Sequence, residues 1–478
     1  MQAPDNKILN GNIYFAFLTL LFIFINFFFS AFTLLCGYTI GPWIFAASIL
    51  ITVFWGVYIK KPSSTALFLG VFLISLLLGY FSFDTTFDSI FYHKPTIEAL
   101  VGGWNPIYDD GENLGMWTLH YARGLELQAS SIASYLGIEA SKSINFLFFF
   151  ATFSLSFCGL YKSFASLSKK QVLIATFVLM LNPVVLSQLF TFYNDSYLYL
   201  ECVSLVTLFI LLYKSEGNRS IYYFMLLTVT LMAVNTKFTH FFFGCLLWGG
   251  FWVYLSYKKN YKLLKKSLIL GIIALAVGVG FIGFNPYVTN FVKTGDPFYP
   301  LLSNQVDIMT SNTPEILKDD NRFIAFVKAQ LSNEDIAWSL IRGKASVADI
   351  IMPSADSRTF GFGILFFPIF LCSLALMIMT RADKKLWIAL VLILLPLAFF
   401  EQSWWARYIP FPWAVATLAV ISYYQSKKLI LQRILYAAIL SMVMFTACIA
   451  MGRNASRRIY AHFHPEVAES LIQNAESE

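Results

Sequence analysis

The sequence predicts an all-α protein that crosses a membrane many times, and three observations lead to this fold class. Of its 478 residues, 58% are hydrophobic and only 13% are charged, about half the charged share of an average soluble domain. The apolar residues form runs of about 20, the length of a membrane-spanning helix. Lys and Arg stand in short clusters between these runs. The composition therefore excludes a soluble enzyme, a disordered chain and a disulfide-rich secreted domain.

Thirteen runs are apolar enough to predict spans, although two of them are short. The first begins soon after Lys7 and is longer than the core of a signal peptide, so we expect it to remain as a helix. No segment has the composition of a soluble domain or repeats another, so a single transmembrane domain over residues 1–478 is expected. The predicted spans are 13–36, 42–59, 64–82, 144–161, 172–190, 196–213, 221–236, 239–257, 267–287, 359–380, 386–400, 408–424 and 434–452.

The positive charges predict the orientation of these spans. With the N-terminus in the cytoplasm, every inside loop carries Lys or Arg, and these loops hold more than half of the chain's 34 basic residues. The opposite orientation would place nearly all of these clusters outside. One group disagrees, because Arg453, Arg457 and Arg458 would follow the last span on the outer face. The net charge of +7 could suggest a nucleic-acid partner. Because the basic residues stand in short clusters between apolar runs, we expect membrane lipid as the partner and no nucleic acid.

Two long segments on the outer face are the expected functional loops. The first covers residues 83–143 and is acidic. The second covers residues 288–358 and includes a stretch of helical composition, 314–342, which we expect at the membrane interface. Loops of this length within a compact unit are usually functional.

The first outer loop opens with two carboxylates, Asp84 and Asp88, where the third predicted span leaves the bilayer. Partial desolvation there is expected to raise a carboxyl pKa and make the group a better base. The alternative is a hydrated loop start in which an Asp caps the next helix. The later acids Asp109, Asp110 and Glu112 lie in a turn and are expected to be solvated.

Further polar residues interrupt the apolar stretches at outer helix ends, where ionisable groups are costly and suggest function. One outer rim would thus collect carboxylates and cations around a cavity. For Lys237 and Arg407, the alternative is that each side chain snorkels to the membrane interface. Trp404 and Trp405 suit an aromatic belt. The residues at this rim are Asn194, Asp195, Lys237, Arg358, Arg407 and Tyr408.

Carboxylates and cations at one membrane surface suit glycosyl transfer from a lipid-phosphate sugar. A carboxylate would deprotonate an acceptor hydroxyl, while Lys and Arg would stabilise the phosphate leaving group. The lipid tail of the donor would reach the site from the bilayer. The transition state has oxocarbenium character, which nearby carboxylates also stabilise.

Six short motifs occur in order between about residues 64 and 424. The first reads Asp88-x-x-x-Tyr92-His93-x-Pro95. The others are Asn194 with Asp195, Lys237-x-Thr239, the segments 295–300 and 360–363, and Arg407 with Tyr408 and Pro410. In this order they resemble the GT-C superfamily of membrane glycosyltransferases, which use polyprenyl-phosphate sugars. Two features depart from the family pattern: two spans precede the first outer loop where one is usual, and Asp296 stands where Asn is expected.

The resemblance implies roles for the residues of these motifs. Asp88 would be the catalytic base, with Asp84 as the nearby substitute, and a helix within 85–135 would lie along the membrane. Lys237, Arg358 and Arg407 would bind the donor phosphate. The expected substrate-binding residues are Tyr92, His93, Asn194, Asp195 and Tyr408.

The leading hypothesis is an inverting transferase that moves one sugar from undecaprenyl phosphate at the periplasmic face of a bacterial inner membrane. The acceptor would be O-antigen or another lipid-linked glycan, lipid A, or a protein. No cofactor is demanded, but Asn194 and Asp195 could help to hold a divalent cation instead of orienting a substrate. The first alternative is an O-antigen ligase or polymerase with a diphosphate-linked donor, which would rely on Arg and His in a late loop. The second is a flippase or secondary transporter, which predicts midplane ionisable residues and an inverted repeat.

Overall fold

The computed structural model describes residues 3–217, 219–301, 313, 317–331, 362–400, 402–427 and 429–476. Helices account for 78% of the structure, and the described residues contain no β-strand. This confirms the all-α class that the sequence predicts.

Among the described residues, seven helices are long and apolar enough to cross a membrane. They are α1 (Ala3–Leu35), α3 (Pro62–Tyr80), α7 (Ser143–Ser163), α10 (Asp195–Lys214), α12 (Phe238–Tyr257), α13 (Tyr261–Val277) and α23 (Ile430–Phe463). Four further apolar helices are shorter: α2 (Pro42–Tyr58), α11 (Ser220–Thr236), α19 (Phe366–Met379) and α22 (Val415–Tyr424). These helices support a protein that passes through a membrane several times.

Two of the predicted spans are interrupted helices. The range 172–190 holds α8 (Lys169–Met180) and α9 (Pro183–Gln188), and the range 386–400 holds α20 (Lys384–Leu394) and α21 (Pro396–Phe399). A proline opens the second piece in each case, because proline cannot donate the backbone hydrogen bond that would continue the preceding helix. Each predicted range therefore contains helix, while the number of thirteen spans stays a prediction.

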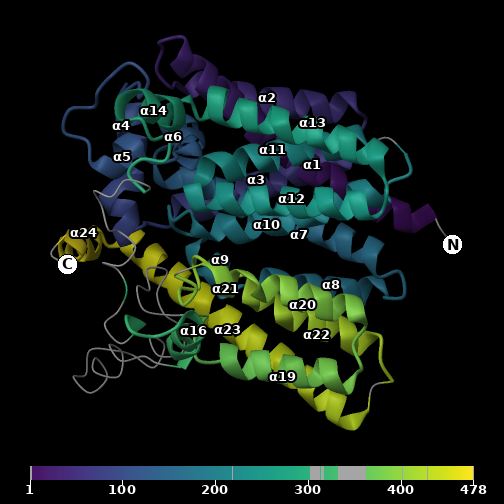
Figure 1. Cartoon of the computed structure of the whole chain (residues 1–478). Helices are drawn as coiled ribbons and strands as arrows, with labels where there is room; N and C mark the ends of the chain where they lie inside the picture. Colours follow the sequence, from purple (N-terminus) through teal and green to yellow (C-terminus); the bar gives the residue numbers. More distant parts are fainter. Residues whose placement is uncertain are drawn as a thin grey trace. The chain divides into compact units, whose positions relative to one another are not determined.

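The chain divides into two compact units. Unit 1 comprises residues 1–163, 190–306 and 458–478, and unit 2 comprises residues 164–189 and 307–457. In unit 1, α1 packs against α2, α3, α7 and α11, while α10 packs against α7, α11 and α12 (Figure 1). Most residues of α1, α7 and α10 are buried, so these three helices form the centre of the unit.

The helices of unit 1 alternate in direction, which collects several basic helix ends at one end of the unit. There Lys61 Nζ lies 4.3 Å from the ring centroid of Tyr14, and Lys214 Nζ donates to the Lys162 carbonyl at 2.6 Å. The Cys158 thiol of α7 contacts a carbonyl early in α1 at 3.7 Å, which joins the two pairs. The predicted inside loops at Lys61, Lys162 and Lys214 thus share one end of unit 1.

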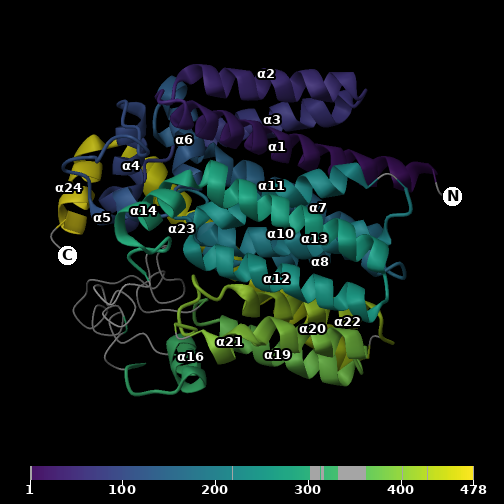
Figure 2. The same ribbon diagram turned by 45° about the horizontal axis from the view of Figure 1, so that its top comes forward.

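The first outer loop folds onto the opposite end of unit 1. A π-helical turn, Ser89–His93, continues directly into α4 (Lys94–Val101). Then follow α5 (Met116–His120) and α6 (Gly124–Leu136). Figures 1 and 2 both place α4, α5 and α6 at the same end of the bundle as α14 (Thr289–Thr294).

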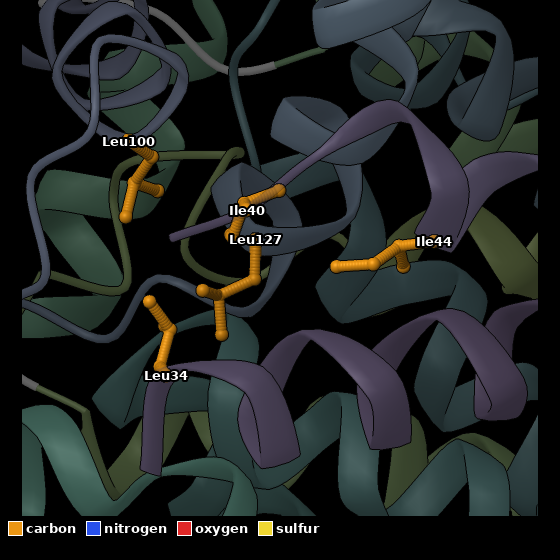
Figure 3. Packing of buried hydrophobic residues seen from close by; sticks show 5 residues of the cluster. All are labelled: Leu34, Ile40, Ile44, Leu100 and Leu127. Carbon is orange, nitrogen blue, oxygen red and sulfur yellow. The ribbon is translucent and has the colours of Figure 1, made fainter. Parts of the chain in front are cut away.

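Helix α6 is inserted among the ends of the long helices. It packs against α1, α2, α4 and α11, and nine of its 13 residues are buried. Figure 3 shows Leu100 of α4 and Leu127 of α6 beside Leu34, Ile40 and Ile44 from the α1–α2 corner. Burial of each such side chain contributes about 1.5–3 kcal/mol. The expectation that a helix within 85–135 lies along the membrane stays a prediction.

Helix α23 carries the basic group that disagrees with the predicted topology, and one arginine of that group, Arg458, is buried. Its 34 residues correspond to about 51 Å of helix, which exceeds the roughly 30 Å of a bilayer's hydrocarbon core. Near its end, Arg458 is buried with its Nε 3.7 Å from Asp84 Oδ1. A buried and paired arginine serves as a counter-ion, so it does not report topology as a loop arginine does. The chain then ends in α24 (Pro465–Glu476).

Unit 2 is built around α8, α19, α20 and α22. The Trp413 indole donates to the Val178 carbonyl at 3.0 Å, and the Asn182 amide donates to the Pro410 carbonyl at 3.0 Å. These bonds tie the interrupted α8–α9 segment to the turn before α22. In the second outer loop, α16 (Arg322–Leu331) is described, while residues 314–316 and 332–342 of the predicted interface stretch 314–342 lie outside the described residues.

Candidate functional site

Asp88 stands immediately before the π-helical turn of the first outer loop, and its side chain is partly exposed. Its backbone N–H donates to the hydroxyl of Tyr193 at 3.4 Å. Tyr193 is buried and directly precedes Asn194 in the chain. This contact therefore brings together two motifs that lie about a hundred residues apart in the sequence.

Asp84 has a different environment, because it is completely buried. Its Oδ1 accepts bonds from the Thr86 N–H at 3.0 Å and hydroxyl at 2.8 Å, and its Oδ2 accepts from the Phe192 N–H at 2.8 Å. Burial alone raises the pKa of Asp84, but the charges of Arg458 and two nearby lysines outweigh it and hold the pKa below its usual value. The expected upward pKa shift is thus wrong for Asp84. Its full set of bonds favours a structural role over that of a base.

Asp195 and Lys237 form a buried ion pair. Lys237 Nζ lies 2.6 Å from Asp195 Oδ1, and the two side chains are 5% and 2% exposed. Lys237 occupies the extended turn between α11 and α12, whereas Asp195 begins α10. Because Asp195 already balances its charge, Lys237 alone would offer little net attraction to a donor phosphate. The Asn194 amide donates to the Thr236 carbonyl at 3.3 Å in the same turn.

His93 and Glu126 form a second buried acid–base contact. His93 Nδ1 is hydrogen-bonded to Glu126 Oε1, and both side chains are almost fully buried. The Tyr92 ring packs on the imidazole with centroids 4.0 Å apart, and the Tyr193 ring lies 6.5 Å away. Glu126 comes from α6, so the insertion of α6 into the bundle holds His93 in place.

One group in unit 1 thus contains six of the predicted site residues. Tyr193 links the Asp88 backbone to the imidazole of His93, and the chain continues from Tyr193 to the buried ion pair. The six residues are Asp88, Tyr92, His93, Asn194, Asp195 and Lys237. They lie at the end of the unit opposite the basic helix ends.

The remaining predicted residues lie elsewhere in the chain. Arg407 and Tyr408 belong to unit 2, where the Arg407 guanidinium lies 4.2 Å from the Trp405 ring centroid and 5.5 Å from that of Tyr408. Trp404 and Trp405 are buried, each 3% exposed, which does not suit a lipid-facing aromatic belt. Arg358 lies outside the described residues.

Sequence reasoning missed a third buried pair, deeper in unit 1. Glu201 Oε2 lies 2.9 Å from His240 Nδ1, and Glu201 Oε1 accepts from the Thr236 hydroxyl at 2.8 Å. Both side chains are 1% exposed. The available signal was the single acid within the predicted span 196–213, since an isolated intramembrane carboxylate usually has a partner.

Arg123, at the start of α6, is a further buried cation that the sequence did not single out. It is 3% exposed, its Nη2 donates to the Leu119 carbonyl at 2.8 Å, and its guanidinium lies 5.0 Å from the Trp104 ring centroid. Burial lowers the pKa of Arg123 to about 9, while the nearby Glu126 acts in the opposite direction. Arg123 therefore remains charged at neutral pH and gives the surroundings of Glu126 a positive potential.

Within the described part of the chain, no three His, Cys, Asp or Glu side chains are grouped as a metal site requires. Comparison with protein-family models, curated proteins and solved structures gives no significant match to this chain. The functional argument therefore depends on the geometry of the residues themselves.

Proposed function

We propose that this protein is a membrane glycosyltransferase that moves one sugar from a polyprenyl phosphate to an acceptor hydroxyl. The observation that carries the proposal is the group around Asp88: a partly exposed carboxylate beside buried, paired polar residues at one end of a bundle of membrane helices. An enzyme with a lipid-anchored donor needs this combination, because the donor arrives through the bilayer and the sugar must react in a polar site.

In the proposed reaction, the acceptor oxygen attacks the anomeric carbon of the donor sugar. Asp88 accepts the proton of that hydroxyl, and the bond between the anomeric carbon and the phosphate oxygen breaks with its electron pair going to the phosphate. Attack opposite the leaving group inverts the configuration. A positioned base contributes about 10²- to 10⁴-fold to such a rate. Asp84, whose two oxygens are engaged, supports the loop that carries Asp88.

The donor phosphate needs positive charge. Lys237 is balanced by Asp195, so a donor phosphate bound beside it would need further positive charge. The donor class, undecaprenyl phosphate, and a periplasmic-face acceptor such as a lipid-linked glycan, lipid A or a protein belong to this proposal. So does placement in a bacterial inner membrane with the site facing the periplasm.

A transfer assay with the purified protein in detergent tests the proposal. It offers radiolabelled polyprenyl-phosphate hexoses with lipopolysaccharide or lipid-linked glycan, and it compares the wild type with Asp88→Asn. Glu112→Gln, an exposed acid in the same loop, is the matched control. We expect label to reach the glycan with the wild type and the control, and transfer by Asp88→Asn to fall at least 100-fold.

Two results would overturn parts of this proposal. If Asp88→Asn kept most of the activity, the assignment of the base would be wrong. If the folded wild type turned over no monophosphate donor, a ligase with a diphosphate-linked donor or a lipid-glycan transporter would become the better hypothesis. Offering a diphosphate-linked glycan, and following glycan movement across vesicles, separates those two.

A further inference from the structure

The contact between His93 and Glu126 leaves two buried polar atoms without a hydrogen-bond partner in the described part of the chain. His93 is 1% exposed and Glu126 is 4% exposed. Neither His93 Nε2 nor Glu126 Oε2 makes a hydrogen bond among the described residues. A buried polar atom without a partner costs roughly 1–3 kcal/mol, so a bound group that satisfies both atoms would be favoured.

The chemistry of the pair defines what that group must supply. A carboxylate only accepts hydrogen bonds, so the contact with Glu126 places the imidazole proton on Nδ1. In the neutral imidazole, His93 Nε2 then carries a lone pair and accepts a hydrogen bond. Glu126 Oε2 is also an acceptor. A group bound here must therefore donate a hydrogen bond to each of the two atoms.

The surrounding charge narrows the choice between a hydroxyl and an ammonium group. Arg123 lies on the same helix turn as Glu126 and interacts electrostatically with it. The Arg123 Nε and Nη1 atoms are themselves buried and have no hydrogen-bond acceptor among the residues that the structure describes. A cationic ligand would be repelled by this guanidinium, whereas a hydroxyl oxygen can accept from a cation and donate to a carboxylate or imidazole.

Aromatic rings complete one side of the site. Tyr92 packs on His93, and Trp117 lies 6.4 Å from Tyr92 and 5.3 Å from Tyr121 between ring centroids. Tyr92 is half-buried, so we expect movement of its ring to open the way to His93. Hydroxyl-binding groups beside aromatic rings match a sugar, which has polar edges and an apolar face.

We propose that the Glu126–His93 pair binds a sugar hydroxyl, with His93 Nε2 as the acceptor atom and Glu126 as the positioning residue. This inference rests on the proposed function and deepens it, because it names residues that recognise one hydroxyl of the sugar. The hydroxyl belongs to the transferred sugar or to the acceptor glycan, and the two arms of the experiment distinguish them. The pair acts in binding and takes no part in the proton transfer assigned to Asp88.

Binding measurements in an Asp88→Asn background test the pair without turnover. One arm uses polyprenyl-phosphate hexoses that each lack a single hydroxyl, and the other uses the corresponding methyl hexosides. We expect loss of one particular hydroxyl to weaken binding about tenfold with the intact pair. Glu126→Gln replaces an acceptor-only carboxylate with an amide that can accept from Nδ1–H or donate to Nδ1, so the imidazole proton is no longer fixed on Nδ1 and the preference for that hydroxyl should shrink to about twofold or less.

Two further variants guard against a trivial loss of folding. His93→Asn keeps an amide nitrogen near the Nδ1 position and removes only the Nε2 atom, so it should abolish the same hydroxyl preference. Glu201→Gln alters an equally buried Glu–His pair in α10 and is the matched control. It should destabilise the protein by a similar amount and leave every hydroxyl preference unchanged.

The outcomes separate this inference from the proposed function. A preference lost in Glu126→Gln and kept in Glu201→Gln supports it, and the arm in which this occurs identifies the source of the hydroxyl. Unchanged preferences in both Glu126→Gln and His93→Asn overturn it. If no polyprenyl-phosphate hexose binds, the proposed function fails, while pair-dependent discrimination among methyl hexosides would still uphold the sugar site. Absence of binding in both arms overturns both.

Discussion

Replacing Lys237 with methionine should destabilise the protein strongly. The substitution keeps the length of the side chain but removes its charge, and Asp195 then stays buried without the partner that lies 2.6 Å away. Breaking a buried ion pair from one side costs about 3–5 kcal/mol, because the remaining charge has lost its solvation and its counter-ion. The pair joins the start of α10 to the α11–α12 turn, so the loss falls on the centre of unit 1.

The double variant Lys237→Met with Asp195→Asn separates a structural role from a binding role. It removes both charges, so most of the lost stability should return, to within about 1–2 kcal/mol of the wild type. If Lys237 also binds the donor phosphate, donor affinity will stay low in the double variant although its stability has recovered. If the pair is only structural, donor affinity will recover with stability.

Unfolding in mixed detergent micelles, followed by tryptophan fluorescence, measures these free energies, and binding of a polyprenyl-phosphate hexose is measured on the same samples. The reasoning would be refuted if Lys237→Met unfolded at the same denaturant concentration as the wild type. It would also be refuted if the double variant were less stable than the single one, because neutralising Asp195 should relieve the unpaired charge.

Three more predictions concern Asp84, its counter-ion Arg458 and the predicted topology. Because the folded-state pKa of Asp84 lies below its usual 3.8, its contribution to stability is present above that pH and is lost as the pH falls through the folded-state pKa. Stability of the wild type should therefore decline below about pH 4 more steeply than that of Asp84→Asn, as seen in acid unfolding curves. Arg458→Leu should cost about 3 kcal/mol in unfolding experiments, because it leaves the buried Asp84 with weaker compensation. In a cysteine-free background, Glu112→Cys should react with an impermeant thiol reagent from outside, and Ser168→Cys only after permeabilisation, because both sites are exposed and belong to opposite predicted faces.

Contrary results would be equally specific. Parallel acid profiles for the wild type and Asp84→Asn would show that the nearby cations do not stabilise the Asp84 carboxylate. Wild-type stability in Arg458→Leu would remove the counter-ion role of Arg458 near the end of α23. Labelling of both cysteines from the same side would reject the predicted topology.

Sequence patterns predicted the membrane class and the helical segments because hydropathy over about 20 residues is a local property. Every predicted span contains helix in the structure, and the basic clusters at Lys61, Lys162 and Lys214 share one end of unit 1. The breaks at Pro183 and Pro396 could also be read from the chain, since proline interrupts helices wherever it follows a full turn. The number of spans and the side of the membrane depend on the bilayer and stay predictions.

The residues of the site were harder to assign from the sequence, because their chemistry depends on partners far away in the chain. Asp84 and Asp88 are four residues apart and look equivalent, yet one is fully bonded and near Arg458 while the other is partly exposed. Lys237 carries the same charge in any reading of the sequence, and only its distance to Asp195 shows that this charge is already balanced.

The sequence alone therefore determined that this chain is an all-α membrane protein with an acidic segment at 83–143 and several ionisable residues at helix ends. Tertiary structure decided which of those residues are buried and how they pair. It also placed Glu126 of α6 in contact with His93, and the positions of these two residues in the sequence do not predict that contact. The physical reason is range: hydropathy acts on neighbours in sequence, while desolvation and ion pairing act on neighbours in space.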